Sequence, residues 1–168
     1  GRPLPLPVVS PQLAAMWKRG ADFLGCPVAI LAGAMTWVSE RNLVSAISNA
    51  GGFGVIACGA MTPALLDAEL KATRALTARP FGVNLITMHP QLMELVEVCA
   101  ANKSTHVVFA GGVPPGEAIK RAKVFAKVVC FAPAVVLAKR LIKNGADALV
   151  IEGSEAGGHI GPVSTSVL

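Results

Sequence analysis

The sequence contains no tyrosine, and only 15% of its 168 residues are charged. Its longest apolar run, residues 128–138, falls far short of a membrane span and contains Pro133, so no membrane association is expected. The N-terminus shows no charged region followed by an apolar one, which excludes a recognisable signal peptide. Aromatic residues are not interleaved with the basic ones, so no nucleic-acid partner is expected. With 53% hydrophobic residues, the chain is expected to fold around one substantial core.

Cysteine is also sparse. The four cysteines are at least thirty residues apart and form no C-x-x-C pair: Cys26, Cys58, Cys99 and Cys130. This spacing argues against metal fingers and disulfide frameworks, and no metal site is expected. Each cysteine lies in or beside an apolar segment, so packing is the expected role, and a reducing, cytoplasmic location fits best.

What the sequence does contain is a repeated alternation of apolar runs and amphipathic segments. Six strands are predicted, over residues 28–31, 54–57, 81–86, 106–110, 127–131 and 148–151. Helices are expected between them, over residues 39–50, from the Thr62-Pro63 pair, from Pro90, over 115–123 and over 134–143. The strands start about 20 to 28 residues apart, which is the length of a βα unit.

These strands read as continuous apolar runs, which indicates a parallel sheet buried on both faces. Two α/β architectures fit, a doubly wound sheet and a (β/α)8 TIM barrel. Six βα units that break off within a seventh loop favour an incomplete N-terminal portion of a barrel, because a complete one needs about 250 residues. We expect residues 1–25 to form an arm and a short helix, and residues 26–168 to form the barrel domain.

An incomplete barrel leaves strands unpaired at two apolar edges. The sequence therefore predicts that the chain is a fragment, or that another chain or a rearrangement covers those edges. A homo-oligomer is one arrangement that would do so.

The most informative stretch is residues 145–161, in which a short apolar strand runs into a loop rich in glycine. Glu152, Glu155 and His159 lie among those glycines. A parallel strand that delivers an adaptable backbone and a titratable ring to its carboxyl end is typical of a ligand site in α/β proteins.

Four motifs follow one another at the ends of successive predicted strands. They are Gly-Ala-Met-Thr-Trp-Val (33–38), Asn-Ala-Gly-Gly-Phe-Gly-Val-Ile (49–56), Arg-Pro-Phe-Gly-Val-Asn-Leu (79–85) and Glu-Gly-Ser-Glu-Ala-Gly-Gly-His-Ile-Gly (152–161). Together they resemble the nitronate monooxygenase family, formerly called 2-nitropropane dioxygenases, and its close relative, the flavin-dependent enoyl-acyl-carrier-protein reductase. The resemblance covers roughly residues 26–168, and its last motif is the most specific.

The resemblance implies a TIM barrel that binds FMN at its C-terminal face. Ala34 and Met35 would lie beside the flavin ring, and Asn84 would hydrogen-bond the ring or the ribityl chain. The residues expected along the cofactor after the sixth strand are Glu152, Gly157 and Gly158. The FMN phosphate usually lies on loops after the last two strands of such barrels, which this sequence does not reach, so the chain as given is expected to hold FMN poorly or not at all.

His159 is the expected catalytic residue, as a general base or as an electrostatic partner of the substrate. Each assignment has a structural alternative. His159 could bond only backbone, Asn84 could bond neighbouring backbone, Met35 could pack in the core, and Glu152 could hold its own loop. His89 is expected to cap a helix and His106 to lie at the amino end of the barrel.

Three functions remain open. The first is an FMN-dependent nitronate monooxygenase that oxidises alkyl nitronates with O2, and the second is an enoyl-acyl-carrier-protein reductase that uses NADH or NADPH. In both, the partner is a small-molecule substrate, a nitronate or an enoyl thioester. The third is a non-catalytic barrel fragment, since one barrel hosts many chemistries.

Overall fold

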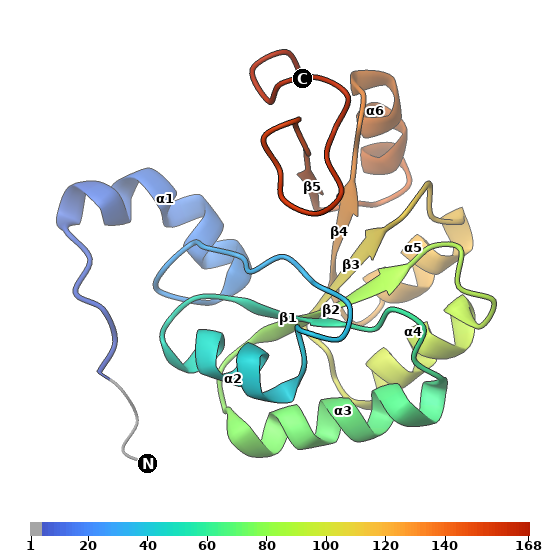
Figure 1. The fold of residues 1–168 in the computed structure, drawn as a ribbon, viewed down its shortest axis with the longest axis horizontal. Coiled ribbons are helices and arrows are strands. Elements are labelled where there is room, and N and C mark those ends of the chain that lie inside the picture. Colours follow the sequence, from blue (N-terminus) through green and yellow to red (C-terminus); the bar gives the residue numbers. More distant parts are fainter. Residues whose placement is uncertain (1–4) are drawn as a thin grey trace.

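The computed structural model describes residues 5–168 and contains one parallel sheet with its connecting helices (Figure 1). The strands are β1 (Gly54–Ala57), β2 (Phe81–Ile86), β3 (His106–Ala110), β4 (Lys127–Phe131) and β5 (Ala148–Val150). The helices are α1 (Pro11–Leu24), α2 (Arg41–Asn49), α3 (Pro63–Leu76), α4 (Leu92–Ala101), α5 (Gly116–Lys123) and α6 (Val135–Lys143). No helix among these residues is long and apolar enough to cross a membrane.

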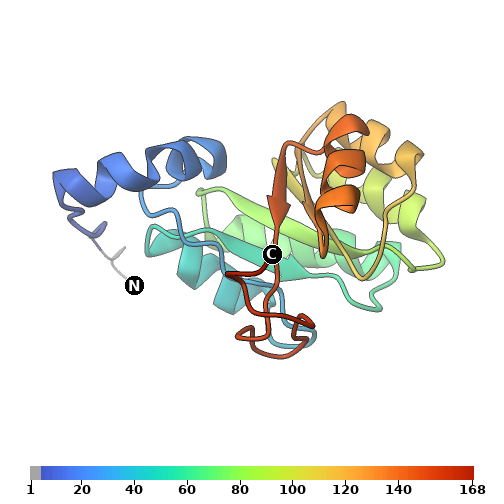
Figure 2. The same cartoon turned by 90° about the horizontal axis from the view of Figure 1, so that it is seen from above.

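The strand order decides between the two predicted architectures. The five strands pair in chain order, β1-β2-β3-β4-β5, and all pairs are parallel. A doubly wound sheet reverses its strand order at a switch point, and no reversal occurs here. The strands form an open arc, with the helices that follow them on its outside (Figures 1 and 2). The prediction of a partial TIM barrel is therefore confirmed.

Two apolar clusters show which face of the arc each strand residue occupies. The outer cluster joins strand residues such as Ile56 and Phe109 to helix residues such as Leu95. The inner cluster contains Val55 and Val108, the immediate neighbours of two outer residues. Successive residues of a strand point to opposite faces, so β1, β3, β4 and β5 contribute to both clusters, whereas β2 contributes only to the outer one and carries Gly82 and Asn84 at its alternate positions. Strands buried on both faces explain the continuous apolar runs of the sequence.

The prediction of a strand over residues 28–31 is wrong. Only Leu31 forms an isolated parallel bridge, with Phe53. The Phe53 N–H donates to the Ile30 carbonyl and the Ala32 N–H to the Phe53 carbonyl, both at 2.9 Å, and the chain then turns away. This segment follows Pro27 and makes only these two ladder bonds, both with Phe53, which are too few for a strand. The sheet of residues 5–168 accordingly has five strands, where six were predicted.

The helices begin and end close to their predicted bounds. The Thr62 hydroxyl accepts a hydrogen bond from the Leu65 N–H at 3.3 Å and so caps α3, as the Thr62-Pro63 pair predicts. The second helix begins at Arg41 and not at Ser39, because the Glu40 carboxylate caps it. Ser39 is buried, and its hydroxyl instead accepts from the Met35 N–H at 2.9 Å.

The N-terminal region is a single helix, α1, preceded by residues without regular structure. Its C-terminal end lies at the amino end of the sheet, where the Phe23 carbonyl accepts hydrogen bonds from Nε2 of His106 and Nζ of Lys127. Within residues 1–25, the structure has a 14-residue helix over Pro11–Leu24. The first four residues of the expected arm lie outside the described residues.

Candidate active site

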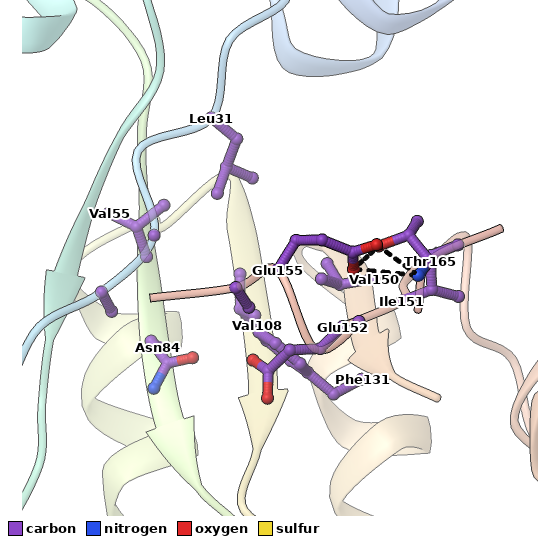
Figure 3. A pocket seen from close by; sticks show the side chains of 14 residues that line it. Leu31, Val55, Asn84, Val108, Phe131, Val150, Ile151, Glu152, Glu155 and Thr165 are labelled. Atoms are coloured by element: carbon purple, nitrogen blue, oxygen red, sulfur yellow. Dashed lines mark hydrogen bonds between the residues drawn. The ribbon is translucent and has the colours of Figure 1, made fainter. Parts of the chain in front are cut away.

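A cavity of about 430 Å³ lies at the carboxyl ends of the strands. Its floor is apolar, because inward-facing side chains of four strands and the Leu31 bridge converge there: Leu31, Val55, Val108, Phe131 and Val150 (Figure 3). An apolar floor with a few polar groups around it is the usual form of a small-molecule or cofactor site.

Asn84 is the polar residue in this floor. It lies in β2 beside Ala57 of β1 and Val108 of β3, and its side chain extends into the cavity (Figure 3). It is only 7% exposed, and its amide forms no side-chain hydrogen bond with any of residues 5–168. A buried amide normally has partners, so this one is available to a ligand in the cavity.

Glu152 follows β5 and brings a carboxylate to the same cavity (Figure 3). It makes no side-chain hydrogen bond within the part of the chain that the structure describes, so the alternative in which it ties its own loop is not the arrangement seen. The tie is made instead by Glu155, whose carboxylate accepts from the backbone N–H and the hydroxyl of Thr165, each at 3.0 Å. These bonds lower the pKa of Glu155, the backbone N–H being the largest cause.

The loop before α2 forms the opposite wall. Gly33 and Ala34 line the cavity, whereas Met35 is half exposed and lies outside the lining. The loop is held by Ser39, and Trp37 adopts a positive φ of 65° and is largely exposed. Of the residues expected beside a flavin ring, the structure therefore places Ala34 at the cavity and Met35 outside its lining.

His159, Gly157 and Gly158 lie in an exposed loop between Ala156 and Gly161. They do not line the cavity, and His159 forms no side-chain hydrogen bond with residues 5–168. The flanking residues Glu155 and Ala156 do line the cavity, so the loop passes its edge. The expected contacts of these three residues with cofactor or substrate stay predictions.

The other two histidines have the expected locations. Nδ1 of His89 accepts from the Gln91 N–H at 3.0 Å, at the start of α4. His106 begins β3 at the amino end of the arc, where Nε2 lies 2.8 Å from the Phe23 carbonyl oxygen. Burial lowers the pKa of His106, and nearby Lys127 lowers it further.

Sequence reasoning missed Thr165 and the apolar floor. The floor has a sequence signal, since its strand residues alternate with outer-cluster residues along β1, β3, β4 and β5. Thr165 has none, because it reaches the cavity through a loop without regular structure.

Cationic side chains concentrate at the other end of the sheet. Lys120, Arg121 and Lys123 lie in the last turn of α5, and Lys127 begins β4. At the carboxyl end, Arg41 begins α2, but its guanidinium and its backbone N–H are both bound to the buried Glu69. The walls described here therefore offer a neutral and acidic cavity, with Glu152 and Glu155 at its edge.

Comparison with known proteins identifies relatives of the whole arc. The sequence model of one family, described as nitronate monooxygenase, matches residues 18–106 and 92–167. Among curated proteins, (3aS,4S,5R,7aS)-5-hydroxy-7a-methyl-1-oxo-octahydro-1H-indene-4-carboxyl-CoA dehydrogenase of Mycobacterium tuberculosis is 35% identical over 150 residues. That match covers 88% of this chain and 41% of the relative.

Two solved structures share the fold over most of the chain. FabK from Thermotoga maritima is 40% identical with a TM-score of 0.85, and the match covers 89% of this chain and 48% of FabK. Nitroalkane oxidase from Streptomyces ansochromogenes is 28% identical with a TM-score of 0.74, over 84% of this chain and 50% of the oxidase. The chain thus spans about half the length of the relatives it matches.

Proposed function

Because this chain belongs to the nitronate monooxygenase family, we propose that the protein is an FMN-dependent oxidoreductase whose flavin lies on the apolar floor of the cavity. The observation that carries the proposal is the buried Asn84 amide, which has no partner among residues 5–168 and extends into an otherwise apolar floor. A flavin ring offers apolar faces to such a floor and hydrogen-bonding edges to such an amide.

The residues of the cavity fit this cofactor in three respects. The five floor residues form a wide apolar surface, Ala34 leaves room beside it, and Glu152 can accept hydrogen bonds from ribityl hydroxyls. When bound, FMN supplies the electron transfer, which no side chain of this chain can perform.

The chain's own residues bind and orient. Asn84 would hydrogen-bond the cofactor, and the apolar floor would exclude water from the surface that the cofactor covers. We assign His159 to the substrate, where a ring N–H donates to an oxygen that carries negative charge in the reaction, either the carbonyl oxygen of a thioester or an oxygen of the nitronate.

The relatives support two substrate classes. The 35% identity with a carboxyl-CoA dehydrogenase favours an acyl thioester as the substrate, and the 40% identity with FabK, an enoyl reductase, favours its reduction with NADH or NADPH. The family description and the 28% identical nitroalkane oxidase favour oxidation of a nitronate with O2. We place the thioester first because the identities are higher, which reverses the order expected from the resemblance to the broader family. A cytoplasmic location suits either substrate.

The test is an anaerobic titration of the full-length, FMN-loaded protein with NADH and NADPH, followed through the visible flavin band. We expect bleaching by one nicotinamide and recovery of the band on addition of crotonyl-CoA. Bleaching by propyl-2-nitronate, with no response to either nicotinamide, would move the assignment to nitronate oxidation. A full-length protein that binds no flavin would overturn the proposal, including its choice of cavity.

His159 has its own test in the same protein. His159→Ala should lower kcat by about 100- to 10,000-fold, to a residual rate, and leave the flavin band and the FMN affinity unchanged, because the residue lies outside the cavity floor. Turnover equal to that of the unmodified protein would remove His159 from the mechanism.

A further inference from the structure

The chain after β5 folds back on itself and forms a closed loop over residues 153–165. The Ser154 N–H donates to the Val163 carbonyl at 2.8 Å, and the Gly161 N–H donates to the Gly153 carbonyl at 3.0 Å. These bonds bring the two ends of the segment together, as in an Ω-loop. The segment includes the Gly-Gly-His sequence of the most specific motif.

One side-chain contact joins the two ends of this loop. The Glu155 carboxylate accepts from the Thr165 N–H at 3.0 and 3.3 Å and from the Thr165 hydroxyl at 3.0 Å (Figure 3). A side chain at Gly153 would overlap both Thr165 and Glu155, so glycine at this position leaves the space that the contact occupies. We call this contact the Glu155–Thr165 clasp.

The clasp lies at the cavity, and His159 does not. Glu155 and Thr165 both line the cavity, on two segments that flank the Gly-Gly-His sequence. The imidazole of His159 has no side-chain hydrogen bond of its own within residues 5–168. Its position relative to the cavity is therefore set by the backbone between the two halves of the clasp.

We infer that Glu155 is a positioning residue: through Thr165 it holds the loop that carries His159 at the mouth of the cavity. This inference rests on the proposed role of His159. Without the clasp, the loop would keep its backbone bonds but lose the side-chain contact that ties it to the cavity wall. Misplacement of a catalytic group by about 1 Å can reduce a rate by roughly 100-fold.

The experiment measures kcat, KM and FMN affinity of full-length variants. Glu155→Ala should lower kcat by roughly 10- to 100-fold and leave FMN affinity unchanged. Glu155→Gln should restore most of the rate, because its amide oxygen accepts from the Thr165 N–H and its NH2 donates to the hydroxyl. Thr165→Val should lower kcat less than Glu155→Ala does, because it removes only the hydroxyl bond and keeps the backbone N–H that donates to Glu155, and Thr165→Ser should resemble Glu155→Gln. Glu117→Ala is the control, since Glu117 is an exposed carboxylate of α5 with no side-chain hydrogen bond among the described residues.

A double-mutant cycle separates positioning from a general structural role. If Glu155 acts through His159, Glu155→Ala should cause no further loss of kcat in a His159→Ala background. Equal losses in both backgrounds, or a kcat unchanged by Glu155→Ala, would overturn the inference while the flavin titration still supports the proposed function. A protein that shows neither flavin binding nor turnover would fail at the proposed function itself.

Discussion

At the scale of single residues, Asn84 is the polar strand residue that most directly indicates a ligand in the cavity. Its amide makes no side-chain hydrogen bond with residues 5–168, yet its polar atoms are open to the cavity, since Trp17 Nε1 is the one buried side-chain N or O atom of these residues without a partner. A ligand in the cavity can therefore replace water as the partner of this amide. An amide in the otherwise apolar strand β2 is therefore explained by a ligand that it binds in the cavity.

We expect Asn84→Ala to weaken FMN binding about fivefold, which corresponds to the loss of one hydrogen bond of about 1 kcal/mol. The measurement is a fluorescence titration of the full-length apoprotein with FMN. Asn49→Ala is a suitable control, because the Asn49 amide bonds the Leu76 carbonyl on the outside of the arc. Equal FMN affinity of the Asn84 variant and the unmodified protein would make Asn84 structural.

Because His106 is buried, we expect the free energy of unfolding to depend on pH. Burial holds its pKa below the ordinary value of about 6.5, so the unfolded chain binds this proton more readily than the folded one. Lys127 lowers the pKa as well, while the Phe23 carbonyl and Asp147 raise it. Its contribution to stability is complete above about pH 6.5 and declines as the pH falls from there towards the folded-state pKa.

The corresponding measurement is urea unfolding at pH 7.5 and 5.5. The unmodified protein should lose more stability between these two values than a His106→Gln variant, which cannot titrate at this position. Other groups titrate in both proteins, so the difference between the two losses is the quantity to compare. Equal losses would show that His106 does not contribute.

At the scale of elements, the close contact of α2 with β1 depends on one glycine. A Cβ at Gly54 would lie 2.5 Å from the Val44 carbonyl oxygen. This contact lets the helix approach the sheet and places the loop before α2 at the cavity wall. Helix propensity and strand periodicity do not reveal such a requirement, because it arises only when the two elements pack.

We expect Gly54→Ala to destabilise the protein by about 1–3 kcal/mol, the usual cost of overpacking. Gly116 provides the matched control, since a Cβ there meets no atom within 4 Å and its φ is not positive. Gly116→Ala should therefore leave stability unchanged or slightly raised. Thermal unfolding of both variants is the measurement, and equal melting temperatures would contradict the packing argument.

The segment over residues 28–31 shows why element predictions fail at edges. Its apolar character resembles that of the true strands, yet it forms one bridge only. A segment becomes a strand only when a neighbouring segment supplies enough ladder hydrogen bonds. The number of these bonds cannot be predicted from the residues of the segment alone.

At the scale of the whole molecule, the common direction of the helices separates charges: basic residues gather at the amino end of the sheet and acidic residues at the carboxyl end. Basic residues in the last turns of α5 and α6 lie towards the amino end of the sheet, while Glu40 and Glu117 lie at helix starts. Each placement complements a helix dipole. Because the helices that follow the strands run in one direction, these local preferences add, and the carboxyl end carries Glu152 and Glu155 as well.

The open arc predicts association of the 168-residue chain when it is produced alone. β5 pairs with β4 on one side only, and its three residues are partly exposed. An unpaired apolar edge is a template for another strand. Size-exclusion chromatography with light scattering should show a mass that rises with concentration. A stable monomer at micromolar concentration would contradict this expectation.

The sequence by itself determined the period of strands and helices, the limits of most of them, the family, and the segments that meet at the cavity. These features depend on local propensities, caps and motifs, each of which involves residues that are close together in the sequence. Only the tertiary structure decided that the strands pair in chain order, that Asn84 has no protein partner, and that Thr165 reaches Glu155. Each of these depends on which distant residues come to lie side by side, and that is settled when the elements pack and not before.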